Sequence, residues 1–483
     1  MNSIIFFGIC VLLTTSSVKT FLLEEKCLAS PPCDCSNTDV FCPGLSLYKV
    51  PKFLPSTRTL ETIELNLQNN VIRMLLNNDF QMLQTAHAAF IDINLGSNSI
   101  QYIEDNAFNG IESSVRVLYL DYNRLSYLPP AIGKLINLSE LALNDNPITT
   151  FDSSVFAGFG SSLSYFTFNV NYMSSWPTDA INKLQKLTTI DVVESLAVNT
   201  TIPSNAFDSV KNTLTTLNYD FDLYDVPYDY QITYFHRLPE AVCSLNRLRT
   251  LRINSYASDS AVDGSVLFEQ CKNVMTSLES LSIYNIQHLN MTEVFTLFPS
   301  LSYLVLNSNL LNDLHLDQYK SGLLTTLDIS YNKFARVPND VNKLTSLVTL
   351  DLASNLITNI ENDDFSALIN LEMLDLSYNI ISRIDPDAFQ NNRKLTTLTL
   401  EGNSLTTIPS SVTVLPNLKL FTFSSNQDVL KPDQLDCSCQ TLGQLKAWKL
   451  DNVYFPNYCA TAVGHSTPVT IKSFIQNDVK ACP

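Results

Sequence analysis

Cysteine is the residue type with the clearest chemistry in this 483-residue chain. Of its eleven cysteines, Cys10 lies in an apolar N-terminal run and the other ten form three groups, each with an even count. Even groups are typical of closed disulfides in an oxidising compartment. No CxxC pair or matched histidine pair accompanies them, so we expect no metal site. The groups are Cys27, Cys33, Cys35 and Cys42; Cys243 and Cys271; and Cys437, Cys439, Cys459 and Cys482.

The other reactive residue types give no catalytic pattern. The five histidines are scattered, none lies in HExxH, and no G-x-S-x-G or phosphate-binding glycine loop occurs. The sequence therefore predicts no enzyme activity, no catalytic residue and no cofactor. The net charge of −17 argues against nucleic acid as the main partner, because phosphates are bound by basic patches.

One repeated pattern, L-x-x-L-x-L-x-x-N-x-L, accounts for the abundance of leucine, with 70 residues in the chain. We number its positions 1 to 11. Fifteen copies follow one another at spacings of 23 to 34 residues, most often 23 to 25. The clear copies begin at Val115, Leu138, Leu301, Leu324, Leu347, Leu371 and Leu395, and the weaker ones at Thr62, Phe90, Leu163, Leu187, Leu214, Leu248, Leu278 and Leu418.

Each copy predicts a short strand whose leucines face inward, since apolar residues alternate over positions 4 to 6. One such unit cannot bury its apolar face alone, so neighbouring units must stack into a continuous core. The asparagine at position 9 turns inward, where its amide can bond to backbone groups of adjacent turns.

At these residues the chain resembles the extracellular leucine-rich repeat family, which includes Toll-like receptor ectodomains and Slit. The segments "CLASPPCDCSNTDVFC" (27–42) and "LDCSCQTLGQLKAW" (435–448) resemble its cysteine-rich caps. The resemblance implies an α/β-type leucine-rich repeat solenoid of about fifteen repeats, curved into a horseshoe with a parallel sheet on its concave face. It also implies the disulfides Cys27–Cys35, Cys33–Cys42, Cys437–Cys459 and Cys439–Cys482.

The expected organisation is a signal peptide at 1–20, an N-terminal cap at 21–61, a solenoid at 62–434 and a C-terminal cap at 435–483. The signal peptide is predicted from the apolar run Ile4–Leu13 and the small residues after it. The C-terminus lacks the hydrophobic tail of a lipid-anchor signal. We therefore expect a secreted, extracellular protein that is not anchored to a membrane.

The repeat becomes irregular at 187–300. Four consecutive units there carry Ser195, Asp222, Tyr256 and Ile286 in place of the position-9 asparagine, and an insertion spans Tyr219–Cys243. A bridge between Cys243 and Cys271 is plausible because adjacent strands lie about 4.8 Å apart. The irregular middle is either a functional site or drift held by one disulfide.

Positions 3, 5 and 7 point to the concave face, and the side chains there are mostly acidic. Ten are acidic and one, Arg252, is basic. Stacked Asp328, Asp351 and Asp375 indicate either a cationic ligand or bound cation, or simply the common strand sequence of the family. The candidate ligand-binding residues are Tyr119, Asp121, Glu140, Tyr165, Asp191, Asp220, Tyr284, Tyr303, Asp328, Asp351 and Asp375.

This face predicts a protein or peptide partner with a basic patch, bound less tightly as salt rises. The first hypothesis is a soluble recognition protein in innate immunity or cell-surface adhesion. The alternative is a non-catalytic subunit or carrier of a secreted enzyme complex, similar to the leucine-rich partner of some crustacean luciferases. The sequence does not predict the oligomeric state.

Two kinds of modification are possible at the surface. Asn137, Asn199 and Asn290 lie in N-glycosylation sequons. Tyr224, Tyr228 and Tyr230 lie among acidic residues, where they are either sulfated or part of an unmodified acidic loop.

Overall fold

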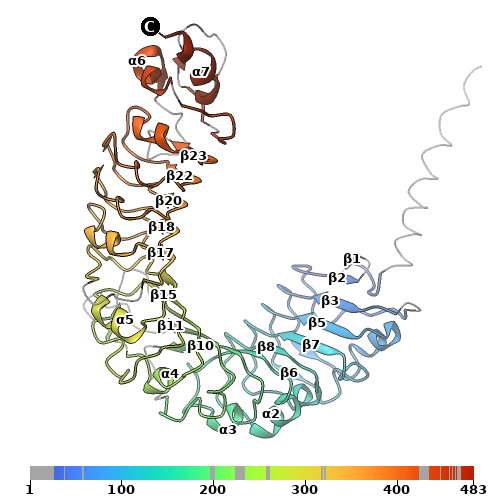
Figure 1. The fold of residues 1–483 in the computed structure, drawn as a ribbon. Helices are drawn as coiled ribbons and strands as arrows, with labels where there is room; N and C mark the ends of the chain where they lie inside the picture. The colour runs from blue at the N-terminus through green and yellow to red at the C-terminus, as the bar shows by residue number, and fades with distance from the viewer. Residues whose placement is uncertain are drawn as a thin grey trace, which may run out of the picture. The chain divides into compact units, whose positions relative to one another are not determined.

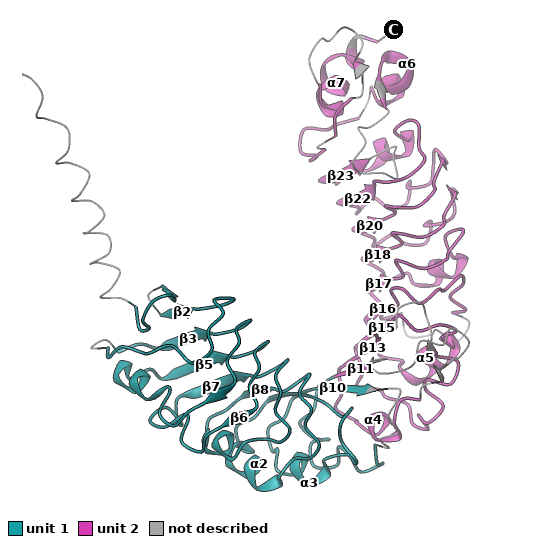
Figure 2. Ribbon diagram, turned by 180° about the vertical axis from the view of Figure 1, so that it is seen from behind, with its two compact units in different colours: residues 1–217 teal, residues 218–483 magenta. Residues whose placement is uncertain are grey.

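The computed structural model describes residues 27–482 except 37, 57–58, 196–201, 223–233, 236, 257–261, 317–318, 320–321, 424–434, 447, 456, 460, 463 and 465–468. The chain forms two compact units, residues 1–217 and 218–483 (Figure 2). The boundary falls inside the segment that the sequence marks as irregular. Each unit is a stack of repeated turns and is described separately.

Unit 1 contains a sheet whose strands run parallel from β2 to β10, with β1 antiparallel to β2 (Figure 1). Alternation sets the inward side chains: in β3, Ile63 and Leu65 are buried while Glu64 is exposed. The strands are β1 (Asp34–Cys35), β2 (Asp39–Phe41), β3 (Thr62–Asn66), β5 (Phe90–Asn94), β7 (Val115–Tyr119), β8 (Glu140–Ala142), β9 (Tyr165–Asn169) and β10 (Thr189–Ser195).

Short helices cover the side of unit 1 opposite the sheet (Figure 2). Helix α2 begins at an N-cap, because the Asp152 side chain accepts a hydrogen bond from Ser154 N at 2.9 Å. The helices are η1 (Gln81–Ala86), η2 (Pro130–Lys134), α2 (Ser153–Phe159) and α3 (Thr178–Ile181), and β4 (Met74–Leu75) pairs with β6 (Tyr102–Ile103).

Unit 2 repeats the arrangement, with strands parallel and in sequence order from β13 to β23. Its repeat strands are β11 (Thr216–Asp222), β13 (Thr250–Ser255), β15 (Ser280–Tyr284), β16 (Tyr303–Val305), β17 (Thr326–Asp328), β18 (Thr349–Asp351), β20 (Met373–Asp375), β22 (Thr397–Leu400) and β23 (Leu420–Phe423).

The other elements of unit 2 are short helices and two-stranded pairs. The helices are α4 (Glu240–Cys243), α5 (Met291–Leu297), η3 (Asn339–Lys343), η4 (Ser410–Val414), α6 (Cys439–Leu442), η5 (Gly443–Leu445), α7 (Ile471–Asn477) and η6 (Val479–Ala481). The pairs are β12 (Tyr234–Phe235) with β14 (Val262–Asp263), β19 (Asn359–Ile360) with β21 (Arg383–Ile384), and β24 (Asp436–Cys437) with β25 (Thr461–Ala462).

All fifteen predicted repeats contain one of these sheet strands, so the predicted leucine-rich repeat solenoid is confirmed. Among the described residues, the position-9 asparagines other than Asn171 bond to the backbone of adjacent turns as expected. Asn355 Nδ2 donates to Ile329 O and Leu352 O at 3.0 Å, and its Oδ1 accepts from Phe334 N at 3.1 Å. These asparagines form a ladder along the solenoid. In unit 1 the ladder is interrupted at Asn171, whose buried Oδ1 has no hydrogen-bond partner.

Disulfides lie near both ends of the solenoid and in its middle. They are Cys27–Cys35, Cys33–Cys42, Cys243–Cys271, Cys437–Cys459 and Cys439–Cys482, the same pairs that the sequence analysis gives. The C-terminal segment also covers the last strand, since Tyr454 N donates to Lys419 O at 2.6 Å and Phe421 N to Tyr454 O at 3.0 Å. Covering the final strand protects backbone groups that would otherwise template aggregation.

Within the described ranges, no helix has both the length and the apolar character needed to cross a membrane.

Candidate functional site

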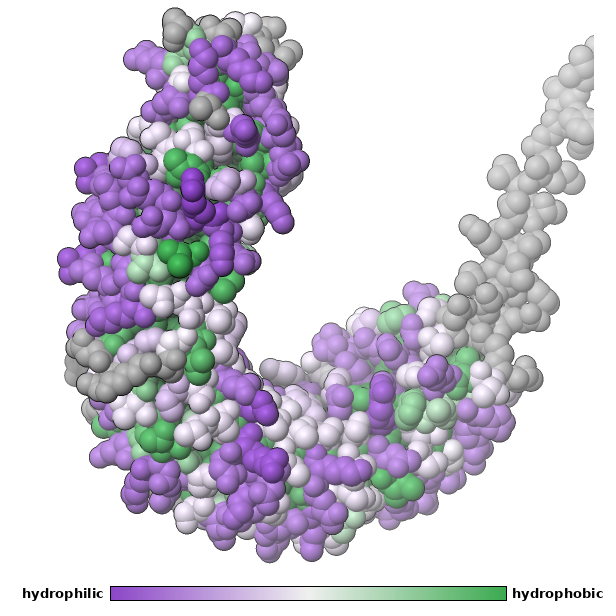
Figure 3. Space-filling view, viewed as in Figure 1, coloured by the Kyte–Doolittle hydropathy of each residue, from purple (hydrophilic) through white to green (hydrophobic). Residues whose placement is uncertain are grey.

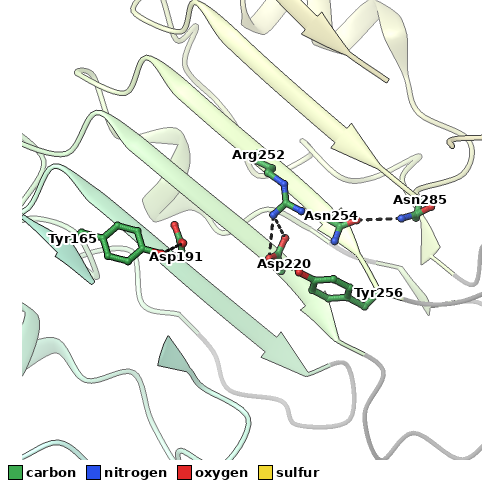
Figure 4. Close-up of polar contacts among 7 residues, drawn as sticks. All are labelled: Tyr165, Asp191, Asp220, Arg252, Asn254, Tyr256 and Asn285. Carbon is green, nitrogen blue, oxygen red and sulfur yellow. Dashed lines mark hydrogen bonds and ion pairs between the residues drawn. The ribbon is translucent and has the colours of Figure 1, made fainter. Parts of the chain in front are cut away.

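The sheet face of unit 1, formed by odd-numbered repeat positions, carries two tyrosine–carboxylate pairs. The Tyr119 hydroxyl donates to Glu140 Oε2, and the Tyr165 hydroxyl donates to Asp191 Oδ2, each at 2.6 Å (Figure 4 shows the second pair). Burial, followed by the hydrogen bond to a carboxylate, raises the pKa of both tyrosines. Both tyrosine hydroxyls therefore remain protonated at neutral pH. The structure brings the four predicted residues together as two hydrogen-bonded pairs.

Asp121 lies on the same unit at position 7 and is largely shielded from solvent. Its Oδ1 accepts a hydrogen bond from Asn144 N at 2.9 Å. Burial, with smaller contributions from the charges of Asp145 and Asp191, raises the pKa of Asp121 to about 6. This carboxylate is thus ionised at neutral pH in an environment that disfavours its charge.

Arg116 is a sheet-face residue that the sequence analysis missed. Its Nε donates to Asp92 Oδ1 at 3.1 Å, a second bond joins Nη2 to Oδ2, and the guanidinium lies 5.3 Å from the Phe90 ring centroid. The motif places Arg116 at position 2, away from the face, but the pairing of β5 with β7 shifts register between Ile91 and Asp92. The sheet face therefore carries a second basic side chain besides Arg252, and this side chain, Arg116, neutralises Asp92.

In unit 2, the carboxylate of Asp220 is hydrogen-bonded to two neighbouring side chains. It is 7% exposed, and Arg252 Nη1 donates to its two carboxylate oxygens at 2.8 and 3.1 Å (Figure 4). The Tyr256 hydroxyl donates to the same carboxylate at 3.2 Å. The guanidinium of Arg252 lies 5.5 Å from the Tyr284 ring centroid. These irregular repeats thus carry an ionic cluster on the sheet face, and one of its members, Tyr256, stands in place of a position-9 asparagine.

Three aspartates form a row at position 5 of adjacent strands in unit 2. Asp328 pairs in register with Asp351, and Asp351 with Asp375. Burial, followed by the charges of Asp375 and Asp328, raises the pKa of Asp351 to about 7. The structure therefore places the three predicted residues side by side, with mutual repulsion at the centre of the row.

Each of these aspartates also closes a turn at the end of its strand. The Oδ1 atoms of Asp328, Asp351 and Asp375 accept hydrogen bonds from the backbone N–H two residues later, at 2.8 to 2.9 Å. In unit 1, the amide oxygens of Asn66 and Asn94 accept the equivalent bonds at 3.0 Å. The turn needs an oxygen acceptor but no charge.

Exposed tyrosines border the aspartate row. Tyr303, at position 3, is 44% exposed, while Tyr331 and Tyr378, at position 8, are 60% and 42% exposed. Both position-8 tyrosines have left-handed backbone, with φ of 54° and 52°. Figure 3 shows apolar side chains scattered among hydrophilic ones on the visible surface of this unit. Tyr331 and Tyr378 are not among the predicted residues, because only odd positions were assigned to the sheet face, although "SYN" occurs at both sites.

The predicted modification sites are only partly described. Asn137 and Asn290 are exposed. Asn137 Nδ2 donates to Ser113 O at 2.8 Å, and Asn290 is the N-cap of α5. Asn199 and the tyrosines Tyr224, Tyr228 and Tyr230 lie outside the described residues.

Comparison with known proteins agrees with this architecture. The family described as "BspA type Leucine rich repeat region (6 copies)" matches residues 84–214, and "Leucine rich repeat" matches 322–381 and 369–427. The chain is a leucine-rich repeat protein. The stretch between these two matched regions contains most of the irregular repeats.

Curated relatives share only parts of their length with this leucine-rich repeat chain. Human "Leucine-rich repeats and immunoglobulin-like domains protein 3" is 33% identical over 112 residues, which are 23% of this chain and 9% of that protein. Toll-like receptor 4 of Felis catus is 23% identical over 152 residues, 30% of this chain and 18% of the receptor. The chain therefore matches less than a fifth of either relative.

A solved leucine-rich repeat protein of Leptospira interrogans shares the fold, with a TM-score of 0.50 at 19% identity. The likeness covers 91% of this chain and 98% of that one.

Proposed function

We propose that this leucine-rich repeat protein is a secreted, non-catalytic recognition protein that binds a basic protein or peptide partner. The proposed contact surface is the sheet face of unit 2 at Asp328, Asp351 and Asp375, with the bordering tyrosines. Leucine-rich repeat proteins are typically scaffolds for protein recognition, and the extended sheet offers many side chains without a catalytic centre. Immune recognition and cell-surface adhesion are the roles we propose for such binding.

The main support for the proposal is the negative charge of the row formed by Asp328, Asp351 and Asp375. Asparagine makes the same turn bond at Asn66 and Asn94, so the negative charge is not needed for the fold. Keeping three carboxylates in register is unfavourable, because like charges on facing strand positions repel. A partner with lysine or arginine side chains would remove that repulsion when it binds.

The bordering tyrosines support the same surface. A non-glycine residue in the left-handed region costs about 1–2 kcal/mol. Position 8 has the same left-handed backbone in other repeats, for example at Asn69, Ser97 and Ser354, so this cost belongs to the repeat turn. Tyr331 and Tyr378 are 60% and 42% exposed at these turns. Tyrosine gives a partner a large apolar surface with a polar end and can also stack against a cation.

Secretion and the domain division are part of the proposal. Five disulfides are typical of extracellular proteins. We propose a signal peptide at 1–20, caps at 21–61 and 435–483, and a solenoid at 62–434 with irregular repeats at 187–300. We further propose N-glycans on Asn137, Asn199 and Asn290.

The proposal can be tested by comparing two triple variants as bait in the native extracellular fluid. The first carries Asp328→Asn, Asp351→Asn and Asp375→Asn, which preserve the turn acceptors. The control carries Glu361→Gln, Asp363→Asn and Asp387→Asn, an equal loss of exposed charge away from the sheet strands. Captured proteins are quantified by mass spectrometry at low salt, at about 0.15 M salt and at high salt.

We expect the parent and the control to capture the same basic partner, with less capture as salt rises, and the sheet-face variant to capture at least about tenfold less. Equal capture by all three proteins would contradict the proposed surface. A stoichiometric enzyme that all three retain would instead favour the role of a non-catalytic subunit or carrier in a secreted complex.

A further inference from the structure

Buried polar atoms without partners lie on β9 and just after β8 in unit 1. Asn144 Oδ1, Thr167 Oγ1 and Asn169 Oδ1 have no hydrogen-bond partner. Asn169 is 5% exposed and Thr167 is 2% exposed. A buried acceptor left unpaired is unfavourable, and in folded proteins an ordered water or ion commonly satisfies it.

Two aspartates lie beside these amides. Asn144 donates its backbone N–H to Asp121 Oδ1 at 2.9 Å, and Asn169 Nδ2 donates to Asp145 Oδ1 at 3.3 Å. Each unpaired amide oxygen therefore belongs to a residue that is bonded to a carboxylate. The side chain of Asn169 is fixed by its bond to Asp145, so its free oxygen is held within this cluster.

The negative charge in the cluster is not balanced at Asp121. Within the described part of the chain, no lysine, arginine or histidine forms an ion pair with Asp121. A water molecule could satisfy the amide oxygens, but it would not offset this charge.

We propose that Asp121, Asn144, Asp145 and Asn169 form a binding site for a divalent cation of the calcium class. Calcium is bound by carboxylate and amide oxygens, often with waters completing the shell. Such a cation satisfies both unpaired amide oxygens and the uncompensated carboxylate. The four residues come from position 7 of three consecutive repeats and from the adjoining position 8, so the ion ties three turns together.

The spacing of cysteines and histidines in the sequence predicts no metal site. Within the described residues, no group of three or more histidine, cysteine, aspartate or glutamate side chains could hold a metal ion. The proposed site has no cysteine or histidine and only two carboxylates, because half of its ligands are asparagines, so neither pattern includes it. It lies in unit 1 and does not depend on the proposed partner surface of unit 2.

The test is calorimetric titration of calcium chloride into the full secreted chain after treatment with EDTA and dialysis. The decisive variant is Asp145→Asn, because asparagine tolerates the left-handed backbone at residue 145, where φ is 53°. The control is Asp387→Asn, which removes an exposed carboxylate from unit 2, away from the sheet strands. Equal melting temperatures of parent and variant in EDTA show that Asp145→Asn leaves the fold intact.

We expect one calcium ion per chain with a dissociation constant on the order of 10⁻⁴–10⁻³ M, as in other extracellular modules. Asp145→Asn should weaken binding at least about tenfold, and Asp387→Asn should leave it unchanged. No binding at millimolar calcium would mean that water alone occupies the cluster and would overturn the proposal. Binding by Asp145→Asn that equals binding by the parent and by Asp387→Asn would overturn it as well.

Discussion

Replacing Arg252 by methionine tests whether Asp220 serves the fold rather than a ligand. The change removes two hydrogen bonds, of 2.8 and 3.1 Å, from a carboxylate that is 7% exposed. Leaving a buried charge unpaired costs about 3–5 kcal/mol. The Tyr256 hydroxyl still donates to Asp220, and the Arg252 side chain is 35% exposed, so we expect the lower end of this range. The expected loss is therefore about 3 kcal/mol.

The chain has two compact units, so hydrogen exchange at β13 and β15 is a better assay than a single global unfolding curve. A loss of about 3 kcal/mol should speed exchange there more than a hundredfold. Arg249→Met is the matched control, because its ion pair with Glu279 is exposed and should contribute at most about 1 kcal/mol.

Adding Asp220→Asn to Arg252→Met should restore much of the protection, since it removes the unpaired charge. If Arg252→Met exchanges no faster than Arg249→Met, or if Asp220→Asn gives no rescue, the ion pair of Arg252 with Asp220 does not stabilise the fold.

Two further predictions concern packing and pH. Gly158→Ala should destabilise unit 1 by about 3 kcal/mol, because its Cβ would lie 1.7 Å from Gly133 O. Gly443→Ala should change stability by at most about 1 kcal/mol, because its Cβ would meet no atom within 4 Å beyond the neighbouring residues; both changes are measured by hydrogen exchange in the unit concerned. Asp351, with a folded-state pKa of about 7 against 3.8 for the ordinary group, holds a proton in the folded chain that the unfolded chain has lost. The contribution of Asp351 to stability should therefore fall as pH rises from about 4 to about 7. Asp351→Asn should raise the melting temperature at pH 8 but not at pH 4, and an equal shift at both values would contradict this assignment.

Much of the fold could be predicted because the repeat is local and periodic. Leucines at positions 4 and 6 alternate as a strand requires, and the unit cannot bury them except against a copy of itself. The strand of every repeat therefore follows from the sequence, including weak copies such as those at Thr62 and Leu418. The disulfide Cys243–Cys271 was also predictable, because both cysteines precede strands of adjacent turns.

The site was less predictable because side-chain pairing depends on register. Arg116 reaches Asp92 only through an irregular register between β5 and β7. Nothing in the motif distinguishes Asp220, which is neutralised by Arg252, from Asp351, which has two aspartates as neighbours. Tyr331 and Tyr378 were missed because a left-handed residue at position 8 breaks the alternation on which the face was assigned.

The sequence by itself determined the repeated strand, the asparagine ladder, the cysteine groups and the acidic character of the sheet positions. These follow from residue type at fixed spacing, since each repeat packs chiefly against its neighbours. Only the tertiary structure decided which acids are neutralised, which close turns and which lie beside unpaired amide oxygens. Those outcomes depend on distances of a few ångströms between side chains of different repeats, which bulges and irregular turns change without altering the motif.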